Sequence, residues 1–160
     1  GDVYKRQSAG CFNPRYTLLL QEFMMTQQRQ LQGLLDHFGR RQGISLTLVN
    51  GVCALQDEQG QEAVVLELPP GSDTLLLHCQ LFAATQLAEQ LTTWRLLMKL
   101  NFEMHAMRGC WLALDEEEQV RLCYQQPLAA LTPATFSTLM LAFMQQAREA
   151  RALLPEIVAA

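Results

Sequence analysis

The sequence predicts a single α+β domain in which a twisted antiparallel sheet packs with three helices, in the order α-β-β-β-α-β-β-α. Three segments repeat hydrophobic residues with helical spacing, and the stretches between them alternate hydrophobic and polar residues, as strands do. The strand segments come in groups joined by short turns. Grouping of this kind favours hairpins and an antiparallel sheet, because parallel strands need a longer crossover connection.

The first helix is predicted from residue 26 onward by a hydrophobic stripe at positions i, i+3, i+4 and i+7. The members of the stripe are Leu31, Leu34, Leu35 and Phe38. Two glycines, Gly39 and Gly43, flank a pair of arginines, which is typical of the end of a helix.

A three-stranded meander is predicted after this helix. Residues 44–49 alternate in character and indicate a first strand. Asn50-Gly51 follows, and this pair is the strongest short hairpin signal because both residue types tolerate positive φ. Residues 52–56 are then the returning strand and residues 62–68 the third strand.

Residues 74–81 follow a Pro-Pro-Gly break and indicate either a further short strand or an extended lead-in to the next helix. The second helix is predicted over residues 85–101. Its stripe consists of Leu87, Leu91, Trp94 and Met98.

A second hairpin and a last helix complete the domain. Residues 109–114 and 119–124 are predicted strands, and the acidic run between them is expected to form their solvated turn. Thr132 and Pro133 suit the N-cap and first position of a helix. Pro155 is expected to end that helix.

Composition excludes several classes of protein. The 160 residues carry a net charge of −4 with no cluster of lysine or arginine, which argues against nucleic-acid binding. No apolar run approaches the roughly 20 residues of a membrane-spanning helix. The five cysteines are widely spaced with no CxxC pair, so we expect reduced, buried thiols in a reducing compartment such as the bacterial cytosol.

Residues 1–23 differ from the rest, because they show no clear periodicity and lack the features of a signal peptide. We expect them to be a non-native extension, with the domain itself spanning residues 24–160. Leu18, Leu19 and Phe23 would nevertheless allow the first helix to continue backwards into this stretch.

No motif for catalysis or for a bound cofactor is present in the sequence. Cys79 or Cys110 with His105 could supply a thiol and a base, but nothing orients such a pair. The acidic turn does not suit a metal ion, because consecutive glutamates in a tight turn cannot all face one ion. We therefore expect a protein that is not an enzyme and that needs no cofactor or metal.

The strands carry more apolar residues than one sheet face can hold, which favours protein binding and self-association. Beyond this surplus, several local patterns resemble the class I type III secretion chaperones, the family of the Tir chaperone. The similar segments are Leu34-Leu35-Asp36-His37-Phe38-Gly39, the hairpin Asn50-Gly51-Val52-Cys53-Ala54-Leu55, Leu96-Leu97-Met98-Lys99-Leu100-Asn101, and Gly109-Cys110-Trp111-Leu112-Ala113-Leu114-Asp115.

The resemblance implies a cytoplasmic homodimer that binds the N-terminal segment of a secreted effector, keeps it extended and delivers it to the secretion apparatus, with contact to the ATPase of that apparatus. It implies a dimer interface that includes Trp94 and Trp111. The effector-binding residues that it suggests are Leu31, Leu34, Phe38, Leu46, Leu112 and Leu122.

Two other interpretations remain open from the sequence. One is a dimeric α+β sensor or adaptor that binds a folded protein or a small ligand. The other is a cysteine-dependent enzyme, for which one thiol would have to react much faster than the rest.

Overall fold

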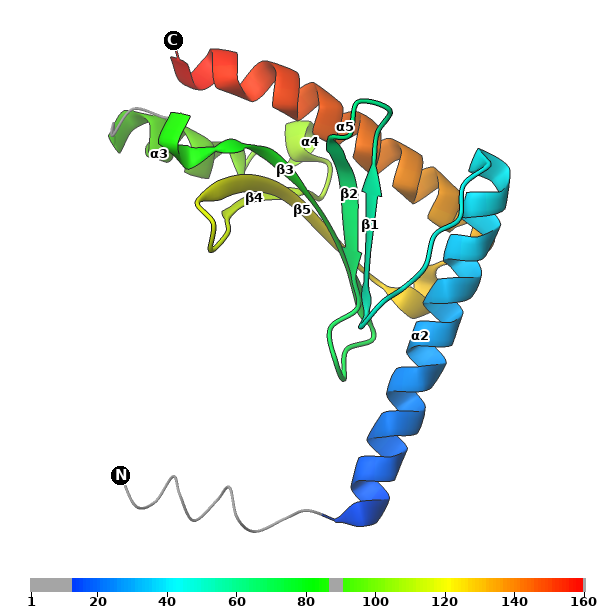
Figure 1. Ribbon diagram of the computed structural model, residues 1–160. Helices are drawn as coiled ribbons and strands as arrows, with labels where there is room; N and C mark the ends of the chain where they lie inside the picture. The colour runs from blue at the N-terminus through cyan, green and yellow to red at the C-terminus, as the bar shows by residue number, and fades with distance from the viewer. Residues whose placement is uncertain (1–12, 87–90, 160) are drawn as a thin grey trace, which may run out of the picture.

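A five-stranded antiparallel sheet in the order β1-β2-β3-β5-β4 forms the centre of the computed structural model, which describes residues 13–86 and 91–159 (Figure 1). The strands are β1 (Val52–Gln56), β2 (Glu62–Glu67), β3 (Thr74–Ala83), β4 (Trp111–Leu114) and β5 (Gln119–Pro127). The helices are α2 (Pro14–Gln42), α3 (Leu91–Leu100), α4 (Met104–Met107) and α5 (Pro133–Ala159). The predicted α+β class and antiparallel sheet are confirmed, and the one-turn helix α4 is additional.

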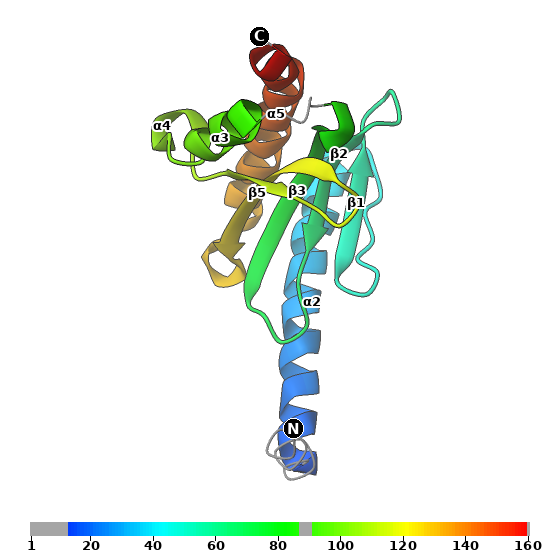
Figure 2. The same cartoon turned by 90° about the vertical axis from the view of Figure 1, so that its left-hand side faces the viewer.

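One face of the sheet is covered by α5, which packs against β2, β3 and β5 and also against α2 (Figure 2). The predicted stripe of the first helix is confirmed, since all four of its members are buried. At the centre of this layer the rings of Phe38 and Phe136 meet edge to face, with their centroids 6.2 Å apart. The core therefore lies between the sheet and these two long helices.

Helix α2 begins earlier than the stripe alone predicts. Asn13 is its N-cap, and the Asn13 side chain accepts a hydrogen bond from the backbone N–H of Arg15 at 3.1 Å. Residues 14–23 thus continue the helix, and its N-terminal part extends beyond the sheet (Figure 1). The non-native origin of residues 1–23 stays a prediction, and residues 1–12 lie outside the described residues.

The prediction of a strand over residues 44–49 is wrong. Only an isolated bridge joins Val49 to Val52, and the third strand of the meander is β3 instead. The side-chain amide of Gln32 on α2 explains the difference. It donates to the carbonyl of Leu46 at 2.9 Å and accepts from the N–H of Leu48 at 2.8 Å. These backbone groups bond to a helix side chain and are unavailable to a neighbouring strand.

Two helix boundaries also differ from the predictions. In the described part of the chain α3 begins at Leu91, whereas Leu87 lies outside the described residues. Pro155 does not end α5, which continues to Ala159. Pro155 cannot donate a hydrogen bond to the carbonyl of Arg151, but the residues after it still continue the helix. Within the described residues, no helix is long and apolar enough to cross a membrane.

A side chain caps the outer edge of β4 at Leu112. Asn101, just after α3, accepts a hydrogen bond from the N–H of Leu112 at 2.7 Å and donates to the carbonyl of Leu112 at 3.2 Å. One amide thus occupies both backbone groups that Leu112 would otherwise offer to another strand.

Replacing Asn101 with alanine should lower the free energy of unfolding by about 1–3 kcal/mol, because both groups of the buried residue Leu112 lose their partner. Urea denaturation measures the change. Glu103→Ala is the matched control, since Glu103 is exposed and makes no capping hydrogen bond. Equal stability of the two variants would contradict this role of Asn101.

Candidate functional site

The other edge strand, β1, has backbone groups that point away from the sheet. Hydrogen bonds alternate in direction along an antiparallel strand. The Gly51 carbonyl accepts from Leu68 on the β2 side at 2.8 Å, and Val52 bonds on the opposite side to Val49 at 2.9 and 3.0 Å. The alternation therefore directs the N–H and C=O of Ala54 outward. Beyond the Val49–Val52 bridge, β1 presents a short edge centred on Ala54.

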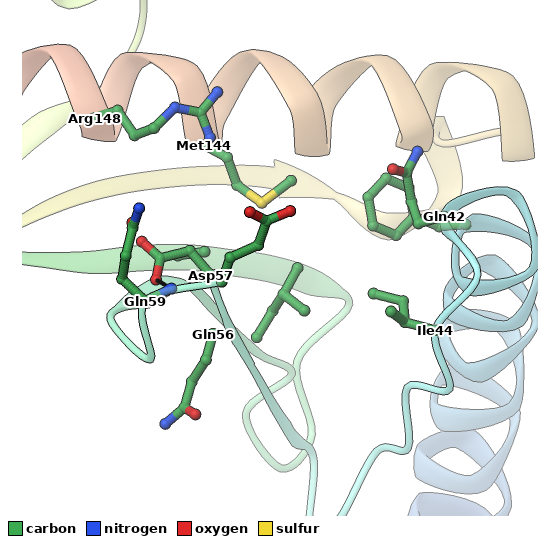
Figure 3. Close-up of a pocket in the computed structure, with 11 residues that line it drawn as sticks. Gln42, Ile44, Gln56, Asp57, Gln59, Met144 and Arg148 are labelled. Carbon is green, nitrogen blue, oxygen red and sulfur yellow. Dashed lines mark hydrogen bonds between the residues drawn. The ribbon is translucent and has the colours of Figure 1, made fainter.

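A groove of about 410 Å³ lies beside this edge, between β1, α5 and the end of α2 (Figure 3). Its apolar wall combines Phe38, Leu55 and Met144, and Figure 3 shows the Met144 side chain extending from α5 toward β1. The residues that line it are Phe38, Gln42, Ile44, Leu55, Gln56, Asp57, Glu58, Gln59, Ala63, Met144 and Arg148. A groove with an apolar wall and a polar rim suits an extended segment that places single apolar side chains against the wall.

Local structure positions each part of the groove. In β1 the buried Cys53 and half-buried Leu55 share the face toward the helices. The chain can turn back from α2 to Ile44 because residue 39 is glycine, since a Cβ there would lie 2.5 Å from the Ile44 carbonyl oxygen. The flexible thioether of Met144 adapts to side chains of different shape.

The six predicted effector-binding residues are all buried, with at most 8% of each exposed. They are Leu31, Leu34, Phe38, Leu46, Leu112 and Leu122. Of these six, Phe38 alone also lines the groove, and the other five belong to the hydrophobic core. Their direct contact with an effector stays a prediction. The sequence reasoning did not identify Ile44, Leu55 and Met144 as groove residues, although the β1 alternation could have indicated Leu55.

The two tryptophans proposed for a dimer interface lie near an exposed apolar surface. Trp94 on α3 and Trp111 on β4 are half-buried, and α3 packs against β4. Helices α3 and α4 and the turn between them carry apolar side chains that are each at least 69% exposed, and we call this set the α3–α4 surface. Its members are Leu91, Met98, Phe102 and Met104.

The residues considered for catalysis show no arrangement for it. His105 lies in α4 rather than in a loop. Cys79 is fully buried, and its sulfur accepts a hydrogen bond from the Arg151 guanidinium at 2.9 Å. Burial raises the pKa of Cys79, and it raises the pKa of Cys110 to about 11. Both effects disfavour the thiolate that a nucleophile needs.

The acidic turn between β4 and β5 stabilises its own hairpin. The Asp115 carboxylate accepts from the backbone N–H groups of Glu117 and Gln119, both at 2.9 Å, and pairs with Arg121 at 3.2 Å. Burial works against the charged form, but these hydrogen bonds and Arg121 outweigh it and lower the pKa of Asp115. Residues 13–86 and 91–159 contain no group of three or more His, Cys, Asp or Glu that could hold a metal ion.

The buried thiols of the described residues should react slowly. Burial raises the pKa of both Cys110 and Cys123 to about 11. At about pH 8 we expect alkylation of these two by iodoacetamide to be about 100-fold slower in the folded than in the unfolded chain. Mass spectrometry of each cysteine measures the rates. If Cys79 or Cys110 reacted as fast in both states, that result would instead support a cysteine-dependent enzyme.

Comparison with known proteins gives a consistent result. The sequence model of the Tir chaperone protein (CesT) family matches residues 33–151. No curated protein matches the sequence.

Several solved structures are similar in fold. The ExsC-ExsE complex shares 26% identity and a TM-score of 0.69, over 80% of this chain and 96% of that chain. For the HopA1-SchA chaperone-effector complex the identity is 20% and the TM-score 0.64, over 80% of this chain and 97% of that chain. For the ExoU-SpcU complex from the type III secretion system of Pseudomonas aeruginosa they are 17% and 0.57, over 78% of this chain and 97% of that chain.

Proposed function

Because the chain belongs to the Tir chaperone protein (CesT) family, we propose that it is a type III secretion chaperone that binds the N-terminal segment of an effector, keeps it extended and delivers it to the secretion apparatus. The proposal includes action in the bacterial cytoplasm and contact with the ATPase of that apparatus. The chaperone-effector complex of HopA1 and SchA supports it, since the fold is shared.

The observation that carries the proposal is the open edge of β1 beside the apolar groove. An extended segment can pair with the outward N–H and C=O of Ala54 and so add a strand to the sheet. Alternate side chains of that strand would then face the groove wall formed by Leu55 and Met144. The opposite edge of the sheet offers no such pairing at Leu112, because Asn101 already occupies its backbone groups.

The free energies involved indicate that pairing at the edge of β1 is one part of a larger contact with the effector. Two backbone hydrogen bonds contribute about 0.5–1.5 kcal/mol each, and one buried Leu-sized side chain about 1.5–3 kcal/mol. Ordering each residue of a flexible segment costs about 1–2 kcal/mol. For a short added strand alone, the favourable and unfavourable free energies of binding are therefore nearly equal. Stable binding requires the segment to continue over further apolar surface or over a second copy of the chaperone.

A homodimer would supply that second copy, and we place its interface at the α3–α4 surface. Trp94 lies in the α3 stripe between Leu91 and Met98, and Trp111 follows on the adjoining strand β4. Exposed apolar side chains grouped beside half-buried aromatic rings suit the centre of an interface.

Ala54→Pro tests the proposed strand addition. Proline removes the outward N–H of Ala54 but none of the β1–β2 hydrogen bonds, because the Ala54 N–H does not point to β2. In pulldowns of the full chain from lysate of the source bacterium, this variant should capture the effector about tenfold less well. Ala54→Ser is the control, since it keeps the N–H and should bind normally.

Protease protection of the captured protein gives the second readout. Protection confined to a segment near its N-terminus is the expected result. Capture of folded partners alone, protected throughout and insensitive to Ala54→Pro, would instead favour the sensor or adaptor.

Phe102→Glu tests the dimer. Phe102 is 86% exposed, so a charge there should leave the single chain folded but disrupt an apolar interface. Light scattering after size exclusion should give the dimer mass for the unchanged chain and the monomer mass for the variant. Leu141→Glu, at an exposed position of α5, is the control and should remain dimeric. A monomeric unchanged chain would refute the dimer.

A further inference from the structure

A chain of polar side chains crosses the face of the sheet opposite the helices. Leu77 and Cys79 of β3 are fully buried in the core, so His78 between them points to the other face. The Nε2 atom of His78 lies 3.1 Å from a Glu67 carboxylate oxygen on β2. On the other side of the ring, Nε of Arg121 on β5 donates a hydrogen bond to Nδ1 of His78 at 2.9 Å.

Arg121 continues the chain to two more carboxylates. Its guanidinium pairs with Asp115 at 3.2 Å and with Glu62 on β2. The same Glu62 oxygen accepts from the backbone N–H of Gln80 at 2.9 Å, beside the irregularity in the β3–β5 register. The side chains of His78 and Arg121 are only 16% and 13% exposed, so these contacts are largely shielded from water.

The two contacts of His78 select one form of its ring. An arginine Nε always carries a proton and can only donate, so Nδ1 of His78 must keep its lone pair. The proton of the neutral ring is then on Nε2, where it donates to Glu67. A second proton could bind only at Nδ1, the atom that faces the Arg121 N–H.

We propose that protonation of His78 breaks its hydrogen bond with Arg121 and so acts as a proton-controlled switch on this face of the sheet. The proton adds to Nδ1, so that two N–H groups face each other and the Arg121–His78 hydrogen bond breaks. The imidazolium keeps its Nε2–H on Glu67, and this contact becomes an ion pair. Arg121 remains bound to Asp115 and Glu62. No covalent bond other than the new N–H is made or broken.

The charged groups around His78 explain why the Arg121–His78 hydrogen bond breaks when the ring is protonated. From β2, Glu67 attracts the imidazolium and Glu62 holds the guanidinium. From β5, Arg121 repels the imidazolium, and from the β4–β5 turn Asp115 retains Arg121. The neighbouring thiol of Cys123 stays neutral throughout, because burial raises its pKa to about 11.

The switch lies next to the open edge described above. Glu67 is the cross-strand partner of Val52, and Glu62 is the partner of Gln56, so two of the three carboxylates of the network stand opposite the two ends of β1. The proposal rests only on side chains of this chain. It holds or fails independently of any cargo and of the proposed chaperone function.

Nuclear magnetic resonance of the full, 15N-labelled chain tests the proposal between about pH 8 and pH 5, the range in which histidines titrate. The ring nitrogens of His78 should show the Nε2–H form at the upper end. The Arg121 Nε–H is followed by its exchange with solvent. His78→Gln is the matched control, since its amide can accept from Arg121 and donate to Glu67 at every pH.

At about pH 5 the Arg121 Nε–H should exchange about tenfold faster in the unchanged chain than in His78→Gln, and at about pH 8 the two should agree. An Nδ1–H ring at the upper end would overturn the proposal. So would an Arg121 signal that keeps its protection while His78 gains its proton. Both of these results are read on the unchanged chain, so they decide the matter even if the variant fails to fold.

Discussion

An N–H or C=O group at the edge of a sheet needs a hydrogen-bond partner, and the two edges of this sheet meet that need differently. At β4 the amide of Asn101 occupies both backbone groups of Leu112. At β1 the Val49–Val52 bridge satisfies one end and leaves Ala54 facing outward. A sheet with two open edges would invite uncontrolled pairing between chains. Ala54 on β1 has no such side-chain cap, and it is the place where we propose strand addition.

Side chains from the helices satisfy several other backbone groups. Gln32 of α2 holds the segment after that helix in place. Arg151 of α5 donates to the carbonyl oxygens of Glu62 at 2.8 Å and Gln80 at 2.6 Å, where the register of β3 is irregular. Because long side chains satisfy these groups, the chain can leave regular sheet geometry there without a desolvation penalty. The groove beside β1 depends on this, since its wall includes Ile44 from the segment after α2.

The fold depends on buried apolar residues, whereas the proposed function depends on apolar residues that stay exposed. The residues with the clearest sequence pattern, such as Leu31 and Leu122, form the core and keep the sheet and helices together. The surfaces available to partners are made by residues with weaker patterns, among them Met144 in the groove and Phe102 on the α3–α4 surface. Hydrophobic periodicity in a sequence indicates which side chains are buried. A binding surface consists of apolar side chains that are not fully buried.

The sequence by itself determined the α+β class, the buried stripe of α2, the Asn50-Gly51 turn and the family resemblance, because each depends on residues close together in the chain. Asn50 and Gly51 both adopt positive φ, as the pair predicts. Only the tertiary structure decided that residues 44–49 leave the sheet and that Asn101 caps Leu112 at the edge of β4. Both outcomes depend on amide contacts between residues 11 to 16 positions apart, on different elements. Alternation in a single segment carries no information about such contacts.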